Sequence, residues 1–93
     1  MDVSAFQAQL QAEGFPTPVS VSKPAGYRMD GHVHDFDACA LIIAGEISIT
    51  VQGECRRYGV GDIFRLPAGT LHSESAVEQG VQYLAGRRSK AQP

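Results

Sequence analysis

Residues 26–45, GYRMDGHVHDFDACALIIAG, decide the fold because they join a pair of histidines to an apolar strand. His32 and His34 are separated by one residue, and residues i and i+2 of an extended strand point to the same face, with Cα atoms roughly 6.5–7 Å apart. The run CALIIA (39–44) is apolar throughout, which is typical of a strand buried on both sides. Whether the two imidazoles hold a metal depends on a third ligand arriving from elsewhere in the chain.

The segments around this stretch also have the pattern of short strands. VSVS (19–22) and ISITV (47–51) alternate apolar and polar residues, and Gly45-Glu46 and Gln52-Gly53 are predicted turns. Further apolar runs follow at intervals of roughly ten residues, separated by turns that contain glycine. The chain is therefore predicted to be an all-β sandwich or barrel.

One helix is predicted before the strands, over about residues 3–13. Its apolar residues recur at the i, i+3 and i+7 spacing of a single stripe: Val3, Phe6 and Leu10. Asp2 or Ser4 can cap the first turn, and Gly14 suits the left-handed position after the last turn. We expect this helix to pack on the outside of the strands.

Composition limits the possible classes of protein. The chain has 93 residues, 43% hydrophobic and 19% charged, which is ordinary for one globular domain. The net charge of −2 gives no basic footprint for nucleic acid or an anionic membrane. No apolar run approaches the ~20 residues that span a bilayer, and the N-terminus lacks signal-peptide order, so a cytoplasmic location is expected. Cys39 and Cys55 lack CxxC spacing and are predicted to be reduced thiols, with Cys39 a small buried hydrophobic residue.

The third histidine lies in residues 61–76, GDIFRLPAGTLHSESA. Together the two stretches resemble the two signature motifs of the cupin superfamily. The first motif is glycine, five residues, HxH, three or four residues, glutamate, six residues and glycine. The second is glycine, five residues, PxG, two residues, histidine, three residues and asparagine. Eight positions match these motifs: Gly26, His32, His34, Gly45, Gly61, Pro67, Gly69 and His72.

The resemblance to a small single-domain cupin implies an all-β double-stranded β-helix, or jelly-roll barrel, with one short N-terminal helix. It implies a single domain over residues 1–93, with the barrel at about 19–86 and a C-terminal tail at 87–93. The basic residues of that tail are interpreted as solvating it: Arg87, Arg88 and Lys90.

The resemblance also implies a metal site, because the three histidines of the chain fall where cupins place their ligands. Each of His32, His34 and His72 alone would be interpreted as a polar residue lining a small barrel. Pro67 presets one backbone angle and Gly69 permits a positive φ in the turn that leads to His72. We therefore predict a bound divalent transition-metal ion, and imidazole ligands do not choose among Fe, Mn, Ni, Co, Cu and Zn.

Two positions depart from the cupin motifs. The usual glutamate is replaced by Ala38 and the usual asparagine by Ala76. The glutamate-dependent activities of oxalate-degrading and germin-like relatives are therefore not carried over. Three histidines alone still resemble the arrangement of some cupin dioxygenases.

Two acidic residues could replace the missing glutamate. Glu74 lies two residues after His72 and is expected to face the HxH pair across the barrel. It could be a fourth ligand and acid/base group, a hydrogen-bond acceptor for a ligand imidazole, or a residue of the barrel mouth. Asp37 has the wrong parity for the interior unless a bulge re-aims it. A solvated turn is the favoured interpretation of Asp35 and Asp37.

Other side chains are assigned to packing, with one alternative left open. The aromatic residues are expected in the core or at its rim: Tyr27, Phe36, Phe64 and Tyr83. Arg65 would contact an anionic substrate if it pointed inward, and alternation along its strand leaves this unresolved.

Three functions remain in competition. The first is a metal-dependent enzyme of dioxygenase, isomerase or lyase type, acting on a small oxygenated molecule in the barrel. The second is a non-catalytic module that binds a small ligand or senses a metal, and the third is a structural domain. The resemblance also predicts a homodimer formed through an edge strand, either VQYLA (81–85) or VSVS (19–22).

Overall fold

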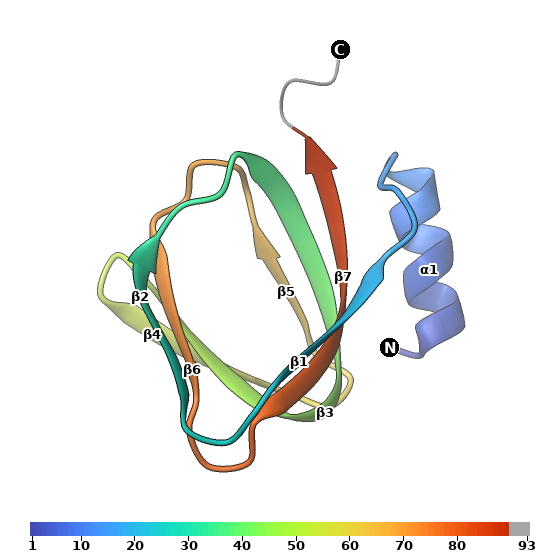
Figure 1. Cartoon of the computed structure of the whole chain (residues 1–93). Coiled ribbons are helices and arrows are strands. Elements are labelled where there is room, and N and C mark those ends of the chain that lie inside the picture. Colours follow the sequence, from blue (N-terminus) through green and yellow to red (C-terminus); the bar gives the residue numbers. More distant parts are fainter. Residues whose placement is uncertain (90–93) are drawn as a thin grey trace.

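The structure is a computed structural model that describes residues 1–89. In this part of the chain one helix precedes seven strands, as Figure 1 shows. The elements are α1 (Val3–Ala12), β1 (Val19–Lys23), β2 (Tyr27–His32), β3 (Phe36–Val51), β4 (Glu54–Gly59), β5 (Ile63–Leu66), β6 (His72–Ala76) and β7 (Val81–Ser89). The predicted all-β architecture with one N-terminal helix is confirmed.

The long strand β3 joins the two halves of the barrel. Its first part pairs with β7 and β5, and its second part pairs with β6 and β4, all antiparallel. The strand order β1-β7-β3-β6-β2 places β1 and β2 at opposite ends of the path, and the sheet curls so that they approach each other (Figure 1).

The predicted turn at Gly45-Glu46 is wrong, because β3 continues through both residues. The register with β7 shifts between Ile42 and Ala44, and Gly45 follows with a φ of +74°. A Cβ atom at Gly45 would lie 2.2 Å from the carbonyl oxygen of Gly80. Glycine therefore serves here to bend a continuous strand close to a neighbouring backbone, as at a bulge. The predicted turn at Gln52-Gly53 is correct, and both of its residues have positive φ.

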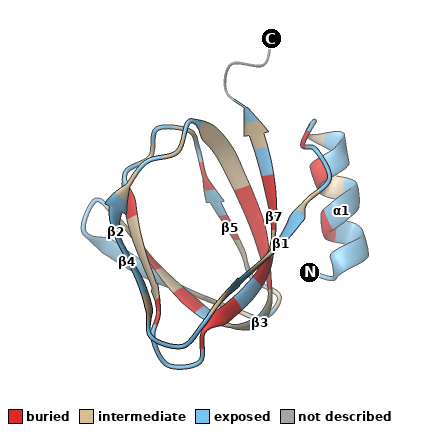
Figure 2. Ribbon diagram, viewed as in Figure 1, coloured by how far each residue is buried: buried red, intermediate tan, exposed pale blue. Residues whose placement is uncertain are grey.

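Two clusters of buried side chains lie on the two sides of β3 and β7, and Figure 2 shows the buried segments of these strands. The larger cluster fills the barrel: Ala40, Ile42, Ile47, Ile49, Phe64, Leu66, Ala76, Val81, Tyr83 and Ala85. The smaller lies between the barrel and α1: Phe6, Leu10, Phe15, Cys39 and Leu41. Residues 39–44 thus contribute to both clusters, which explains why that run is apolar on both faces and why Cys39 is buried.

Helix α1 packs against the outside of the barrel beside β7, as predicted (Figure 1). Asp2 is the N-cap, and its Oδ1 accepts a 2.8 Å hydrogen bond from the Ala5 N–H. Phe6 and Leu10 are buried, whereas Val3 is 40% exposed and does not extend the buried stripe. No helix in the described residues has the length and apolar character needed to cross a membrane.

Strand β7 extends past the predicted end of the barrel at residue 86. It reaches Ser89, which pairs with Phe36, because β3 begins early enough to continue the ladder. The interpretation of Arg87 and Arg88 as part of a solvated tail is therefore wrong; residues 90–93 of that predicted tail, including Lys90, lie outside the described residues.

One predicted dimer edge is also excluded. The VQYLA segment (81–85) of β7 pairs with β1 on one side and β3 on the other, so its backbone groups are already used. The VSVS segment (19–22) lies in β1, which within residues 1–89 pairs with β7 alone.

Candidate metal centre

The three histidines come from two neighbouring strands and the loop after one of them. His32 is the last residue of β2, and its register partner is His72, the first residue of β6. His34 lies beyond the end of β2, so the two histidines of HxH do not share a regular strand as the spacing predicted. A register shift between Met29 and His32 re-aims the end of β2.

The three imidazoles nevertheless converge. The ring centroid of His32 is 4.2 Å from that of His72 and 4.9 Å from that of His34, and the centroids of His34 and His72 are 5.2 Å apart. One potential ligand atom from each residue lies within 4.8 Å of the other two. The convergence predicted from the two motifs is therefore present.

Backbone carbonyls orient two of the rings. His32 Nδ1 is 2.9 Å from the carbonyl oxygen of Asp30, and His72 Nδ1 is 3.0 Å from that of Thr70. With a proton on Nδ1 each ring donates to its carbonyl and keeps the lone pair of Nε2 available. His72 is 2% exposed, and its Nε2 has no hydrogen-bond partner among residues 1–89. A buried polar atom without a partner is rare in proteins, and an ion held between the three rings would supply one.

His34 is biased toward the neutral form that metal binding requires. Burial lowers the pKa of His34, and the neighbouring His32 and His72 lower it further. Its ring stacks on Phe36 with centroids 4.6 Å apart and an angle of 18° between the planes. Phe36, which the sequence assigned to packing, therefore also holds the third imidazole in place.

Glu74 adjoins the triad from the strand that carries His72. Its Oε2 is 3.6 Å from His72 Nε2, and its side chain is 10% exposed. The expectation that it faces HxH across the barrel is wrong, because β6 and β2 are adjacent and Met29 is its register partner. Its role as ligand or acid/base group stays a prediction.

Tyr27 is a polar contributor to the site that the sequence assigned to packing. Its hydroxyl donates a 2.5 Å hydrogen bond to Oε1 of Glu74. Burial raises the pKa of Tyr27 well above its usual range, and Glu74 raises it further, so the hydroxyl keeps its proton. Pairing of β2 with β6 creates this contact between residues 47 positions apart, and no local pattern could have shown it.

Asp37 holds the two ligand-bearing loops together from outside the barrel. Its Oδ1 accepts a 2.9 Å hydrogen bond from the Ala68 N–H, and its Oδ2 lies 3.0 Å from an Arg88 nitrogen. The solvated-turn interpretation is wrong for Asp37, since pairing in β3 directs its carboxylate to these partners. Asp35 lies exposed in the connection between β2 and β3.

The PxG turn contacts the HxH loop directly. Gly69 has a φ of +82°, and its N–H donates a 2.9 Å hydrogen bond to the carbonyl oxygen of His34. Thr70 N–H closes the turn onto the carbonyl of Pro67 at 3.1 Å. The role predicted for this turn, to bring His72 to the other two histidines, is thus visible in the backbone.

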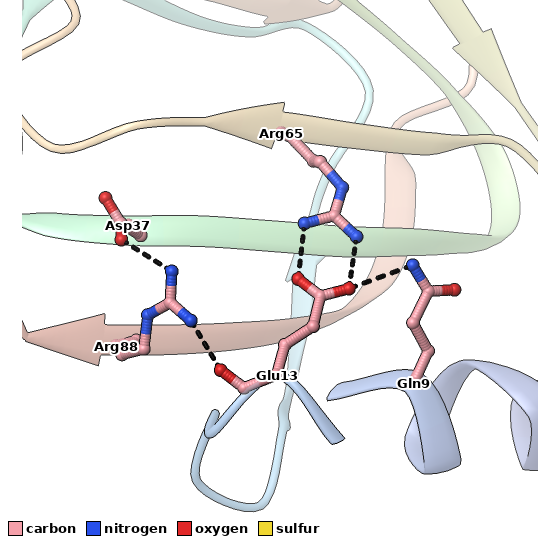
Figure 3. Close-up of polar contacts among 5 residues, drawn as sticks. All are labelled: Gln9, Glu13, Asp37, Arg65 and Arg88. Carbon is pink, nitrogen blue, oxygen red and sulfur yellow. Dashed lines mark hydrogen bonds and ion pairs between the residues drawn. The ribbon is translucent and has the colours of Figure 1, made fainter. Parts of the chain in front are cut away.

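Arg65 points away from the site, so the suggestion that it binds an anionic substrate in the barrel is not supported. Its guanidinium nitrogens donate to both carboxylate oxygens of Glu13, at 2.9 and 2.8 Å (Figure 3). Figure 3 also shows Arg88 between Asp37 and the backbone carbonyl of Glu13. This network ties the end of α1 to the outside of the barrel.

The space beside the triad is small. A cavity of about 50 Å³ is lined by His34, His72 and Glu74 together with apolar residues of the barrel and Arg87. A water molecule takes up about 30 Å³ in the liquid, so this space accepts only a small chemical group.

Comparisons with known proteins agree on the type of domain. A family model described as EutQ-like cupin domain matches residues 10–83. No match was found among the curated proteins.

Three solved structures illustrate the likeness. KdgF from Halomonas sp. is 26% identical with a TM-score of 0.68, covering 78% of this chain and 68% of that one. The DMSP lyase DddQ from Ruegeria pomeroyi DSS-3 is 28% identical with a TM-score of 0.69, covering 80% of this chain and 38% of that one. A cupin superfamily protein from Desulfitobacterium hafniense DCB-2 shares the fold at 21% identity, with a TM-score of 0.68, covering 76% of this chain and 64% of that one. The chain thus spans less than half of the length of the lyase. The fold shared with these structures confirms the predicted double-stranded β-helix.

Proposed function

This chain belongs to the EutQ-like cupin domain family, and on that premise we propose that His32, His34 and His72 bind a divalent transition-metal ion. The observation that carries the proposal is the buried Nε2 of His72, which has no hydrogen-bond partner among the described residues although its ring lies beside two other imidazoles. A purely structural role would be expected to satisfy that nitrogen within the protein.

The ligand set fits such an ion. Imidazole nitrogens bind Zn²⁺ at about 2.0–2.1 Å, so two of them on one ion lie at most about 4.2 Å apart. The separations of up to 4.8 Å in the triad require only small side-chain rotations to reach this value. Neutral imidazole is a good ligand for Fe, Mn, Co, Ni, Cu and Zn, and the metal is left to measurement.

We further propose that the protein is a metal-dependent enzyme of dioxygenase, isomerase or lyase type acting on a small oxygenated molecule. The ion would polarise an oxygen atom of that molecule or take part in redox chemistry. Glu74, held by Tyr27 and adjacent to His72, supplies a carboxylate that can accept or return a proton. The lyase named among the similar structures supports this class, although that name describes the other protein.

One observation favours a non-catalytic binding or sensing module instead. The cavity beside the triad has a volume of only about 50 Å³, far below the roughly 300–1,000 Å³ of typical small-molecule sites. A module that binds the metal with one small group would need no more space. Oxygen consumption and turnover, measured with a panel of chelating oxygenated substrates, separate the two functions.

The decisive test of metal binding is elemental analysis of protein produced without a histidine tag. We expect close to one transition-metal ion per chain, and little metal after combined His32→Ala and His72→Ala substitution. Asp35→Ala is a suitable control because Asp35 is exposed near the site and should leave the metal content unchanged. Stoichiometric metal in the double variant would refute the assignment.

The predicted homodimer and cytoplasmic location remain part of the proposal. Strand β1 is the remaining candidate for the dimer contact, because within the described residues it pairs only with β7. Light scattering that shows a monomer at working concentration would exclude the dimer, and cell fractionation tests the location.

A further inference from the structure

Arg87 is an exposed residue near the end of β7 that lines the cavity beside the triad. Residues Val81, Tyr83 and Ala85 of this strand are buried in the barrel core, and Arg87 has the same parity. It lines the small cavity beside the triad, whereas its neighbour Arg88 points outward to Asp37.

The guanidinium of Arg87 has no carboxylate partner among residues 1–89. It lies over the ring of Phe36, with 5.6 Å between the guanidinium carbon and the ring centroid. Phe36 in turn stacks on His34.

The residue paired with Arg87 leaves space beside it. Ala38 of β3 is its register partner and packs at the edge of the barrel core with only a methyl group. Both residues line the cavity of about 50 Å³, which has room for one or two water-sized groups. A carboxylate group is of that size.

With a divalent ion bound, the cavity would carry a net positive charge, which favours an anionic ligand. Three neutral imidazoles leave both charges of a divalent ion uncompensated, and Arg87 adds a third positive charge. Glu74 is the one acidic side chain among the described residues that line the cavity, and its Oε1 already accepts a hydrogen bond from the Tyr27 hydroxyl. Neighbouring positive charges favour binding of a negatively charged ligand, and a guanidinium matches a carboxylate with two parallel hydrogen bonds.

We propose that Arg87 and Ala38 form a subsite for the carboxylate group of a small anionic ligand, next to the metal centre. The proposal rests on the proposed metal binding and narrows the ligand class to carboxylates. Arg87 fixes the carboxylate, and the space left by Ala38 lets one of its oxygens approach the ion. The remainder of the ligand then lies at the mouth of the barrel, because the cavity itself is too small for it.

The test uses Co²⁺-loaded full-length protein and acetate as the probe. Acetate is titrated at constant ionic strength while the visible absorption of the ion is followed, with chloride as the comparison anion. We expect saturable acetate binding that Arg87→Gln weakens about tenfold or more, the loss expected for a charge-assisted hydrogen bond. Co²⁺ affinity itself should change much less. Arg87→Lys should restore part of the acetate affinity.

Two further variants make the result specific. Arg57→Gln removes a surface arginine that pairs with Glu46 on β3, and it should leave acetate binding unchanged. Ala38→Glu supplies a carboxylate from the protein itself, so it should abolish acetate binding while the ion stays bound. Circular dichroism at the assay temperature checks that each variant is folded.

The outcomes separate the two proposals. Equal acetate affinity in the parent protein and Arg87→Gln overturns the subsite alone, as does a Co²⁺ spectrum that acetate does not change. Absence of Co²⁺ binding overturns the metal centre and the subsite together.

Discussion

The carboxylate of Asp37 accepts a 2.9 Å hydrogen bond from the backbone N–H of Ala68, 31 residues further along the chain. Ala68 is the middle residue of the PxG turn that leads to His72, and Asp37 is the second residue of β3, the strand that follows His34. Together with the bond from the Gly69 N–H to the carbonyl oxygen of His34, this contact holds the PxG turn against the segment that carries His34.

Asp37→Ala should weaken both the fold and metal binding. It removes the acceptor for the Ala68 N–H and one of the two partners of Arg88, so we expect a loss of about 1–3 kcal/mol in the free energy of unfolding. Metal affinity should fall as well, because the two loops are no longer held in register. Urea unfolding and competition with a chelator measure the two effects. The control is Asp35→Ala, which changes an exposed carboxylate two residues away; equal losses in both variants would contradict the prediction.

Metal affinity should fall when the pH is lowered and should not change when it is raised above neutrality. Histidine binds metal when neutral, and its usual pKa is about 6.5. Burial lowers the pKa of His34, so this ligand is neutral at pH 7 and stays so at pH values where an exposed histidine is already protonated. We expect constant affinity above about pH 7 and progressive loss as the pH falls below about 6.5. Chelator competition at a series of pH values checks this, and affinity that rises on acidification would exclude histidine ligation.

Gly45→Ala should destabilise the barrel strongly. Gly45 has a φ of +74°, and an added Cβ would lie 2.2 Å from the carbonyl oxygen of Gly80. The strain of a left-handed residue and the backbone clash together should cost about 2–5 kcal/mol. Gly53→Ala is the matched control: its φ is +80°, but nothing lies within 4 Å of the added Cβ, so it should cost only about 1–2 kcal/mol. Urea unfolding of both variants compares them, and equal costs would show that the close approach to Gly80 is unimportant.

The contribution of Glu13 to stability should disappear in acid. Its two hydrogen bonds from Arg65 are the main cause that lowers its pKa from 4.5 to about 2. Because the folded-state pKa is below the unfolded value, this stability is present above pH 4.5 and is lost as the pH falls through about 2. Glu13→Gln should therefore lower the melting temperature at pH 7, with a difference that shrinks between pH 4.5 and 2. The control is Glu46→Gln, which breaks an exposed single contact with Arg57 and should change little at either pH.

The sequence specified much of this molecule through local patterns. The apolar stripe and Asp2 cap predicted α1, the alternating runs predicted the strands, and the spacing of the two motifs predicted that three histidines meet. The helix and strand predictions succeeded because side-chain direction in these elements follows directly from residue number. The meeting of the histidines was predicted by the resemblance to the cupin motifs, since His34 lies outside β2. The doubly apolar run 39–44 likewise predicted a strand buried on both faces, and α1 supplies the cover on its outer side.

The errors share one cause, which is that local patterns contain no information about partners far along the chain. Gly45 has the features of a turn residue, and only the nearby backbone of Gly80 shows that it bends a continuous strand instead. Glu74 was expected across the barrel from HxH, whereas pairing of β2 with β6 places it beside Tyr27.

The amino-acid sequence by itself determined which residues can bind a metal and which segments form strands, because both depend on residue type and on spacing over a few positions. Only the tertiary structure decided where the neighbouring polar side chains lie: Asp37 and Arg88 pair with each other on the outside of the barrel, whereas the exposed Arg87 lines the cavity beside the histidines. The face toward which each side chain points depends on strand register, because a shift of a single residue moves it to the opposite face. The register is fixed only when the strands pair.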